Sequence, residues 1–286
     1  MSDPVIVGTD GSAAGSAAVE WAADDAARVR APLRIVFALD RSPYDIPRFS
    51  VREWGDALTR NAERVLAESE ALARERRPEI EVTTQMIEGA PAVVLRDQAA
   101  GATEVVIGSR GLGGFAGAVL GSVSTHVAGH ARGPVVVVHA GPRTAHGEVA
   151  VGIDDSPQCD PALAYAFEQA ALRGATLRAL YVWQAPVHAY APEVVYDMDE
   201  IRRAQYQVVA DKLASWRQTY PQVKVIGDVR SGHPVEVLTA ASEGADLVVV
   251  GSHGRGALGS LALGSVSRGV LHHARGTVAV VRSPRA

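Results

Sequence analysis

An internal repeat constrains this chain more than any other feature of its sequence. Asp10 corresponds to Asp154 and Gly108 to Gly251, so matching residues lie 144 and 143 positions apart. Matched spacings along the whole length are typical of duplicated structural units. The 286 residues therefore contain two copies of one unit. We expect these units at residues 1–141 and 147–286, joined by a polar segment that contains Gly and Pro.

Each copy alternates short apolar segments with longer amphipathic ones, which indicates strands and helices in turn. This order predicts an α/β fold: a doubly wound, Rossmann-like parallel sheet with helices on both faces. In the first copy the expected strands are 5–7, 33–39, 80–87, 105–107 and 135–138, and the helices 13–30, 53–76, 91–100 and 122–131. In the second copy the expected strands are 149–153, 177–182, 223–229, 247–250 and 278–281, and the helices 161–173, 199–220, 234–243 and 265–273.

Composition narrows the class of protein further. Aromatic residues make up 5% of the chain, so its cores must be built from Ala, Val, Leu and Ile. The net charge of −4 argues against a nucleic-acid-binding surface, which needs a basic domain. One cysteine, Cys159, excludes an internal disulfide and a Cys-rich metal site, and we expect it to be a surface or first-turn thiol without a catalytic role. Neither an export signal nor a long apolar run is present, which favours the cytoplasm and no membrane association.

Ligands of doubly wound sheets bind at the carboxyl ends of the strands, where the winding direction reverses. Two segments of each copy follow such strand ends. If the first and fourth strands are neighbours, these segments face each other. The segments contain the candidate binding residues Gly8, Asp10, Ser12, Gly108, Ser109, Arg110, Gly111, Gly121, Ser122, Val123 and Ser124, and in the second copy Gly152, Asp154, Ser156, Gly251, Ser252, His253, Gly254, Gly264, Ser265, Val266 and Ser267.

The segment after the fourth strand has the form Gly-x2-Gly-x9-Gly-Ser in both copies. We expect its glycines to adopt positive φ and to let the backbone approach a ligand. The third glycine precedes a helix, whose first N–H groups, with two serine hydroxyls, would form a phosphate site. Arg110 would add charge, and His253 replaces it in the second copy. Asp10 and Asp154 would repel phosphate, so they fit a ribose hydroxyl or a Mg²⁺ ion bridging to phosphate. The glycines could instead serve turn geometry alone.

Other chemistries lack their motifs. The glycine-rich segment has no Gly-Lys-Ser/Thr ending, which excludes a Walker P-loop, and no Ser–His–Asp nucleophile elbow is present. His126 and His130 have the i, i+4 spacing of metal ligands, but the second copy lacks this pair, so we interpret them as non-ligating. The long segments 40–52 and 184–197 follow the second strands; each is either a functional lid or a disordered surface excursion.

These motifs together resemble the ATP-binding branch of the universal stress protein family, in a tandem form that covers essentially the whole chain. The resemblance implies sheets of strand order 3-2-1-4-5. It implies ATP with its ribose at Asp10 or Asp154, its triphosphate on the glycine-rich segment, and its adenine against the backbone near Phe37-Ala38 or Tyr181-Val182. Ala38 and Val182 are therefore candidate binding residues as well. Asp155 in place of Gly11, and His253 in place of Arg110, predict weaker ATP binding in the second copy or a greater need for Mg²⁺.

The sequence is compatible with three different functions. The leading hypothesis is a stress-response regulatory protein that binds ATP in each domain and changes conformation or partner with occupancy. The alternatives are a slow Mg²⁺-dependent ATPase or phosphotransferase, and a scaffold whose sites are empty. The fifth strands, Val135–Val138 and Val278–Val281, are apolar sheet edges, so we expect pairing through them, as a homodimer or within one chain. The competing explanation is an edge covered by the linker or by Pro284.

Overall fold

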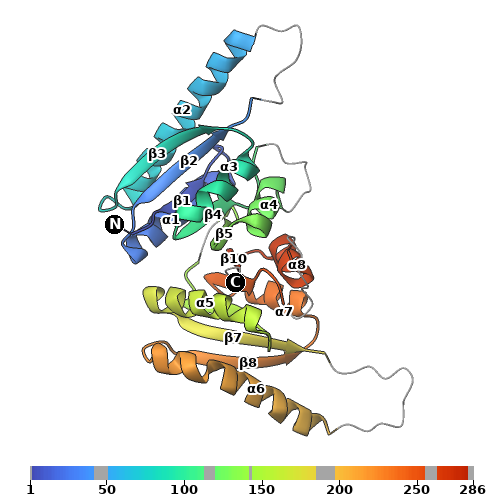
Figure 1. The fold of residues 1–286 in the computed structure, drawn as a ribbon. Coiled ribbons are helices and arrows are strands. Elements are labelled where there is room, and N and C mark those ends of the chain that lie inside the picture. The colour runs from blue at the N-terminus through green and yellow to red at the C-terminus, as the bar shows by residue number, and fades with distance from the viewer. Residues whose placement is uncertain are drawn as a thin grey trace, which may run out of the picture. The chain divides into compact units, whose positions relative to one another are not determined.

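The computed structural model describes residues 2–41, 51–112, 120–141, 144–184, 197–254 and 263–282. The chain forms two compact units (Figure 1), the first mainly residues 1–142, the second residues 143–260 and 264–283. Most of the two long segments 40–52 and 184–197 lies outside the described residues, as do most of the two x9 spacers, part of the linker, and Pro284.

The first unit has five parallel strands in the order β3-β2-β1-β4-β5. This is the 3-2-1-4-5 arrangement that the resemblance implied, and it makes the first and fourth strands neighbours. The elements are β1 (Val5–Gly8), α1 (Ala13–Val29), β2 (Leu33–Leu39), α2 (Val51–Arg76), β3 (Val82–Glu88), α3 (Pro91–Gln98), the 3₁₀ turn η2 (Ala99–Gly101), β4 (Glu104–Gly108), α4 (Ser122–His130) and β5 (Pro134–Val138).

The second unit repeats this topology, with five parallel strands in the order β8-β7-β6-β9-β10. Its first strand β6 again lies between its second strand β7 and its fourth strand β9. The elements are β6 (Glu148–Ile153), the 3₁₀ turn η3 (Pro157–Cys159), α5 (Asp160–Arg173), β7 (Thr176–Trp183), α6 (Met198–Thr219), β8 (Val225–Ser231), α7 (Pro234–Ala241), β9 (Leu247–Gly251), α8 (Ser265–His273) and β10 (Val278–Val281).

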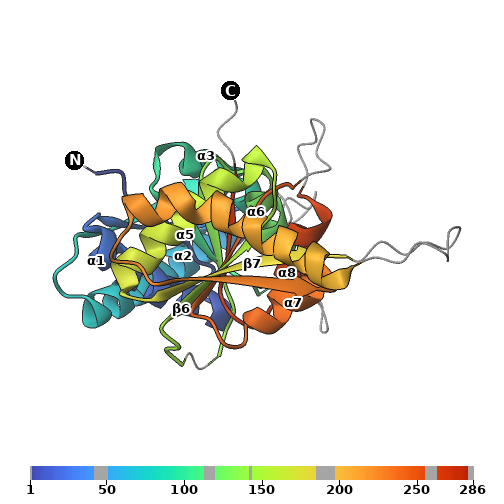
Figure 2. The same cartoon turned by 90° about the horizontal axis from the view of Figure 1, so that it is seen from below.

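Helices cover both faces of each sheet. In the first unit α1 packs on α2, and α3 packs on α4. In the second unit α5 and α6 lie on one side of β7, and α7 lies on the other (Figure 2). The central strands are therefore buried on both faces: Val5, Ile6 and Val7 of β1 have no exposed surface, and neither do Val149 and Val151 of β6. The doubly wound α/β fold predicted from the sequence is confirmed.

Three local features differ from the predictions. β3 and β8 each begin two residues later than expected, because the N–H groups of Ile80 and Val223 close turns on the carbonyls of Arg77 and Tyr220 (3.3 and 3.1 Å). The turn η3 was not predicted. It places Cys159 at the N-cap of α5 and in the interior at 4% exposure. Of the two predicted alternatives, the surface thiol was therefore wrong, and the thiol at the first turn of a helix agrees with the structure.

The described helices include none that combines the length and the apolar character needed to cross a bilayer.

Candidate functional site

In the first unit a cavity of about 320 Å³ opens at the carboxyl ends of β1 and β4. The loop after β1, the start of α3, the loop after β4 and the first turn of α4 enclose it. The residues that line it are Gly8, Thr9, Asp10, Gly15, Val36, Ala38, Pro91, Leu95, Ile107, Gly108, Arg110, Gly111, Gly121, Ser122, Val123 and Ser124. The two predicted loops therefore meet at one cavity, as the position of β1 beside β4 requires.

The carboxylate of Asp10 joins these two loops. Its Oδ1 accepts a hydrogen bond from the N–H of Ser12 (3.0 Å), and its Oδ2 accepts one from the N–H of Leu112 (2.8 Å). Ser12 adds a second link, because its hydroxyl donates to the carbonyl of Arg110 (3.3 Å) and accepts from the N–H of Gly15 at the start of α1 (3.1 Å). Asp10 is therefore held in place at the cavity wall by backbone donors.

Close approach of neighbouring groups explains the glycines of the second loop. A Cβ at Gly111 would overlap the Asp10 carboxylate, and one at Gly254 would lie 2.7 Å from Oδ2 of Asp154. A Cβ at Gly108 would lie 2.7 Å from the carbonyl carbon of Ala14. The expectation of positive φ was wrong, because none of these glycines is among the described residues with positive φ. Glycine is needed here because the neighbouring atoms leave no space for a side chain, and not because the backbone adopts a left-handed conformation.

The first turn of α4 supplies backbone donors to the cavity. Gly121 is its N-cap and contributes no side-chain cap, so the N–H groups of Ser122, Val123 and Ser124 have no acceptor within the helix. The N–H of Gly121 is already used, since it donates to the carbonyl of Ser109 (2.8 Å). The hydroxyl of buried Ser124 donates to the carbonyl of Gly108 (2.7 Å), which fixes the helix start against the end of β4. This leaves the exposed Ser122 as the hydroxyl best placed for a ligand.

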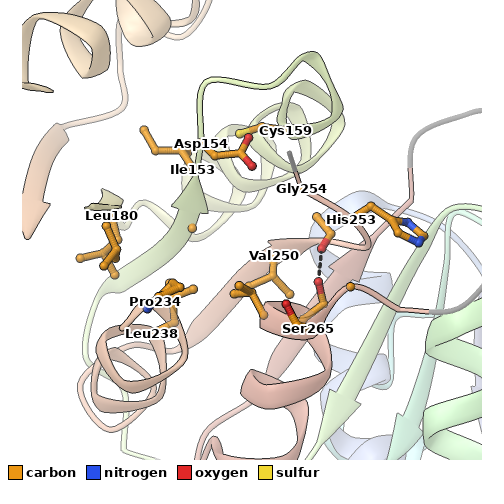
Figure 3. A pocket seen from close by; sticks show the side chains of 16 residues that line it. Ile153, Asp154, Cys159, Leu180, Pro234, Leu238, Val250, His253, Gly254 and Ser265 are labelled. Carbon is orange, nitrogen blue, oxygen red and sulfur yellow. Dashed lines mark hydrogen bonds between the residues drawn. The ribbon is translucent and has the colours of Figure 1, made fainter. Parts of the chain in front are cut away.

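The second unit repeats this arrangement around a cavity of about 530 Å³ (Figure 3). The N–H of Gly264 donates to the carbonyl of Ser252 (2.9 Å), and the Ser267 hydroxyl donates to the carbonyl of Gly251 (2.5 Å). The lining residues are Gly152, Ile153, Asp154, Cys159, Leu180, Val182, Pro234, Leu238, Val250, Gly251, His253, Gly254, Gly264, Ser265, Val266 and Ser267.

The loop after β6 differs from its counterpart in how it is held. Asp154 Oδ1 accepts hydrogen bonds from both the N–H and the hydroxyl of Ser156 (3.0 and 2.5 Å). The ammonium of Lys212 on α6 donates to the carbonyl of Ser156 (2.9 Å) and pairs with Asp160 (2.8 Å). The second unit thus brings a cation to the loop that also carries the additional Asp155.

Two other side chains of this cavity bear on its chemistry. His253 Nδ1 lies 3.1 Å from the hydroxyl of Ser252, and its ring is directed away from Asp154 (Figure 3). Burial raises the pKa of the Cys159 thiol to about 11. Cys159 is therefore a protonated thiol at neutral pH.

The two cavities bring together every predicted binding residue except four serines: Ser12, Ser109, Ser156 and Ser252 do not line them. Ser12 and Ser156 instead bond within the loops, as described above. Ser109 and Ser252 are buried at 1% and 4% exposure. Of the segments expected near adenine, Ala38 and Val182 line the cavities, whereas Phe37 and Tyr181 do not.

Sequence reasoning missed an apolar wall in each cavity. In the first unit it consists of Val36, Leu95 and Ile107; in the second it consists of Leu180, Leu238 and Val250. The register of the strands identifies two of these wall residues, because Gly8 pairs with both Val36 and Ile107. Gly8 also makes room for the wall, because a Cβ there would lie 2.6 Å from Leu95 Cδ1. An apolar wall opposite backbone donors suits a ligand with a planar ring and an anionic tail.

His126 and His130 lie outside both cavities. Their rings stack with centroids 4.3 Å apart, and His130 Nδ1 lies 2.8 Å from the carbonyl oxygen of His126. Burial, with the charges of His130 and Arg96, lowers the pKa of His126. Across the described ranges, His, Cys, Asp and Glu side chains form no group of three or more with a metal-binding arrangement.

Fold and site together define a class of protein: two tandem doubly wound α/β units, each with a glycine-rich loop and a helix N-terminus at the point where the winding reverses. A sequence model of the universal stress protein family matches residues 1–139 and 147–282. The chain belongs to the universal stress protein family.

Individual relatives show the same similarity. A universal stress protein of Mycobacterium tuberculosis strain H37Rv is 36% identical over 97% of this chain and 96% of its own length. The crystal structure of a universal stress protein from Archaeoglobus fulgidus matches 98% of this chain and 96% of its own with a TM-score of 0.71, at 22% identity. A further solved universal stress protein, in complex with cAMP, is 30% identical over 49% of this chain and 98% of its own, with a TM-score of 0.38.

Proposed function

We propose that this protein is an ATP-binding regulator of the stress response, with one nucleotide site in each unit. Occupancy of these sites would change its conformation or its choice of partner. The observation that carries the proposal is the uncapped N-terminus of a helix, α4 or α8, at one end of a cavity whose other wall is apolar. Phosphate suits the N–H groups and the helix dipole at one end, and adenine suits the apolar wall at the other.

Asp10 and Asp154 lie between these two ends in the proposed binding mode. Each lines its cavity and is held by hydrogen bonds, from two backbone N–H groups at Asp10 and from the N–H and hydroxyl of Ser156 at Asp154, so it can accept further hydrogen bonds from the ribose hydroxyls. Mg²⁺ bound between phosphate and this carboxylate would neutralise the repulsion between the two anions. Asp10 and Asp154 are the carboxylates that line the described cavities, so we propose that Mg²⁺ takes its remaining oxygen ligands from ATP and water.

Quantifying the nucleotide that copurifies with the protein tests this proposal. Gly121→Glu would place a carboxylate at the start of α4 and is expected to remove ATP from the first unit. Gly121→Ala is the matched control, because its Cβ would make ordinary contacts, the shortest being 3.4 Å to the Ser109 carbonyl oxygen. Two ATP per chain, falling to one in Gly121→Glu and unchanged in Gly121→Ala, is the expected result. Equal ATP content in all three proteins would refute the site.

We propose binding, not catalysis, as the principal activity. Slow Mg²⁺-dependent hydrolysis or phosphotransfer is the second candidate, and the carboxylate of Asp10 beside the proposed phosphate site is the observation that favours it. Steady ADP release that is lost in Asp10→Asn, with ATP binding retained, would establish the second candidate. The absence of ADP release from protein saturated with ATP and Mg²⁺ would support the binding role.

We also propose that the protein pairs through its fifth strands, β5 and β10, which are terminal strands in the order of their own units. The pairing partner is either the other unit of the same chain or a second copy. Light scattering coupled to gel filtration tests the second case: twice the chain mass of 30.0 kDa indicates a homodimer, and a mass near 30.0 kDa excludes it and leaves pairing within one chain. In the monomeric case, a cross-link between cysteines introduced in β5 and β10 distinguishes this pairing from an edge covered by another segment. The cytoplasmic location stays a prediction from the sequence.

A further inference from the structure

A second cavity adjoins the nucleotide cavity of the second unit. This side cavity has a volume of about 730 Å³ and lies at the end of β7, between the first turns of α6, α7 and α8. It shares Val182, Pro234, Ser265 and Val266 with the nucleotide cavity, so the two are continuous along the start of α8. The shared segment, Ser265-Val266, is where the phosphates of a nucleotide are proposed to lie.

The repeat allows this region to be compared with the same positions in the first unit. Gly232 donates its N–H to the carbonyl of Trp183 (3.0 Å), and Gly89 donates to that of Leu39 (3.1 Å), so Trp183 and Leu39 are structurally equivalent. The same correspondence relates Tyr181 to Phe37. His233, which follows Gly232 as the N-cap of α7, corresponds to Ala90, the N-cap of α3.

All three replacements change the chemistry in the same direction. Phe37, Leu39 and Ala90 carry no side-chain hydrogen-bonding group, whereas Tyr181, Trp183 and His233 each carry an O–H or N–H. Trp183 and His233 also place aromatic rings where the first unit has Leu39 and Ala90. Tyr181, Trp183 and His233 all line the side cavity, together with the amides of Gln184 and Gln205. Aromatic faces bordered by such polar groups bind planar heterocycles, by stacking on the ring and hydrogen bonding at its edge.

The helix ends around the side cavity add a preference for negative charge. α7 and α8 both begin at its wall without a side-chain cap, and the free N–H groups of their first turns carry partial positive charge, although Pro234, the first residue of α7, has no N–H. Asp197, Asp199 and Glu200 at the start of α6, and Glu236 in the first turn of α7, lie near this region but are not among the residues that line the side cavity. The described residues that line it include no Asp or Glu that would oppose an anion. The side cavity therefore suits a planar ring that arrives attached to phosphate.

We propose that the second unit binds an elongated ligand of the dinucleoside polyphosphate class. One nucleoside occupies the nucleotide cavity, the phosphates lie along Ser265 and Val266, and the second base enters the side cavity against Trp183 and His233. This inference rests on the proposed function, because it extends a nucleotide already bound at α8. It also assigns different ligands to the two units, since the first unit has Leu39 and Ala90 at the corresponding positions.

Calorimetric titration of the full chain with two probes, ATP and diadenosine tetraphosphate, tests the proposal. Gly121→Glu is introduced throughout so that the first unit does not contribute. Diadenosine tetraphosphate is expected to bind about tenfold more tightly than ATP, the increment that stacking of one further base provides. Trp183→Leu and His233→Ala, which copy the first unit, should reduce this preference and leave ATP affinity within about twofold.

Tyr206→Leu is the matched control, because it removes an aromatic ring from α6 that is 47% exposed and lies outside the side cavity. Equal affinity for the two probes, or a preference that survives both Trp183→Leu and His233→Ala, would overturn the inference while ATP binding upholds the proposed function. A protein that binds neither probe would overturn both. If Trp183→Leu fails to fold, the exposed His233→Ala alone decides the outcome.

Discussion

Adding one methyl group at Gly111 tests how the binding loops are held. In Gly111→Ala the new Cβ would overlap Oδ2 of Asp10, the atom that accepts the hydrogen bond from Leu112 N–H (2.8 Å). The carboxylate must move, and this hydrogen bond breaks. A hydrogen bond to a charged group contributes roughly 1.5–3 kcal/mol. Leu112 is 73% exposed, so a hydrogen bond to water compensates for part of the lost interaction. We therefore expect the free energy of unfolding to fall by about 1 kcal/mol.

A double-mutant cycle measured by thermal unfolding isolates this effect. For a unit of this size, about 1 kcal/mol corresponds to a decrease in Tm of roughly 2–4 °C. In an Asp10→Ala background the methyl group of Gly111→Ala meets no carboxylate, so its cost should fall to within about 0.5 kcal/mol of zero. Gly101→Ala is the control, because nothing described lies within 4 Å of its added Cβ. An equal cost of Gly111→Ala in both backgrounds would refute the proposed role of Asp10.

The ionisable groups give three further predictions. Because burial raises the Cys159 pKa to about 11, iodoacetamide at pH 8 should modify the folded protein far more slowly than the protein in urea; equal rates would contradict the burial of this thiol. The same shift stabilises the fold fully below the unfolded pKa of 9.0, and this contribution should disappear as the pH rises through about 11. Burial opposes ionisation of Asp24, but hydrogen bonds from Arg76 and Arg77 outweigh it and lower its pKa. Asp24→Asn should therefore lower the free energy of unfolding by about 1 kcal/mol at pH 7. A decrease that persists after the pH has fallen below the pKa of Asp24 in the folded protein would show that the ion pair is not its cause.

The sequence by itself determined the repeat, the order of strands and helices, and the loops that carry the site. Buried parallel strands appear in the sequence as continuous apolar segments. The helices that connect them form right-handed crossovers, so the local sequence pattern is sufficient to predict this fold. The same repeat located Asp10 and Asp154, and the Gly-Ser-Val-Ser segment at the start of each site helix. These features depend on residues close together in the chain, which is why pattern alone could find them.

Tertiary structure decided what each side chain of the site contacts. The glycines at 111 and 254 are explained by the aspartates of another loop, and the apolar wall by strand register and by the leucines of α3 and α7. The sequence alone showed two differences between the units, at Asp155 and His253, but the grouping of Tyr181, Trp183 and His233 around one cavity emerged only in three dimensions. Such contacts join residues that lie far apart in the chain, and their distances are set by how helices pack on the sheet. No local pattern encodes that packing, so the sequence indicated where a ligand would bind, and the fold determined the shape that a ligand must have.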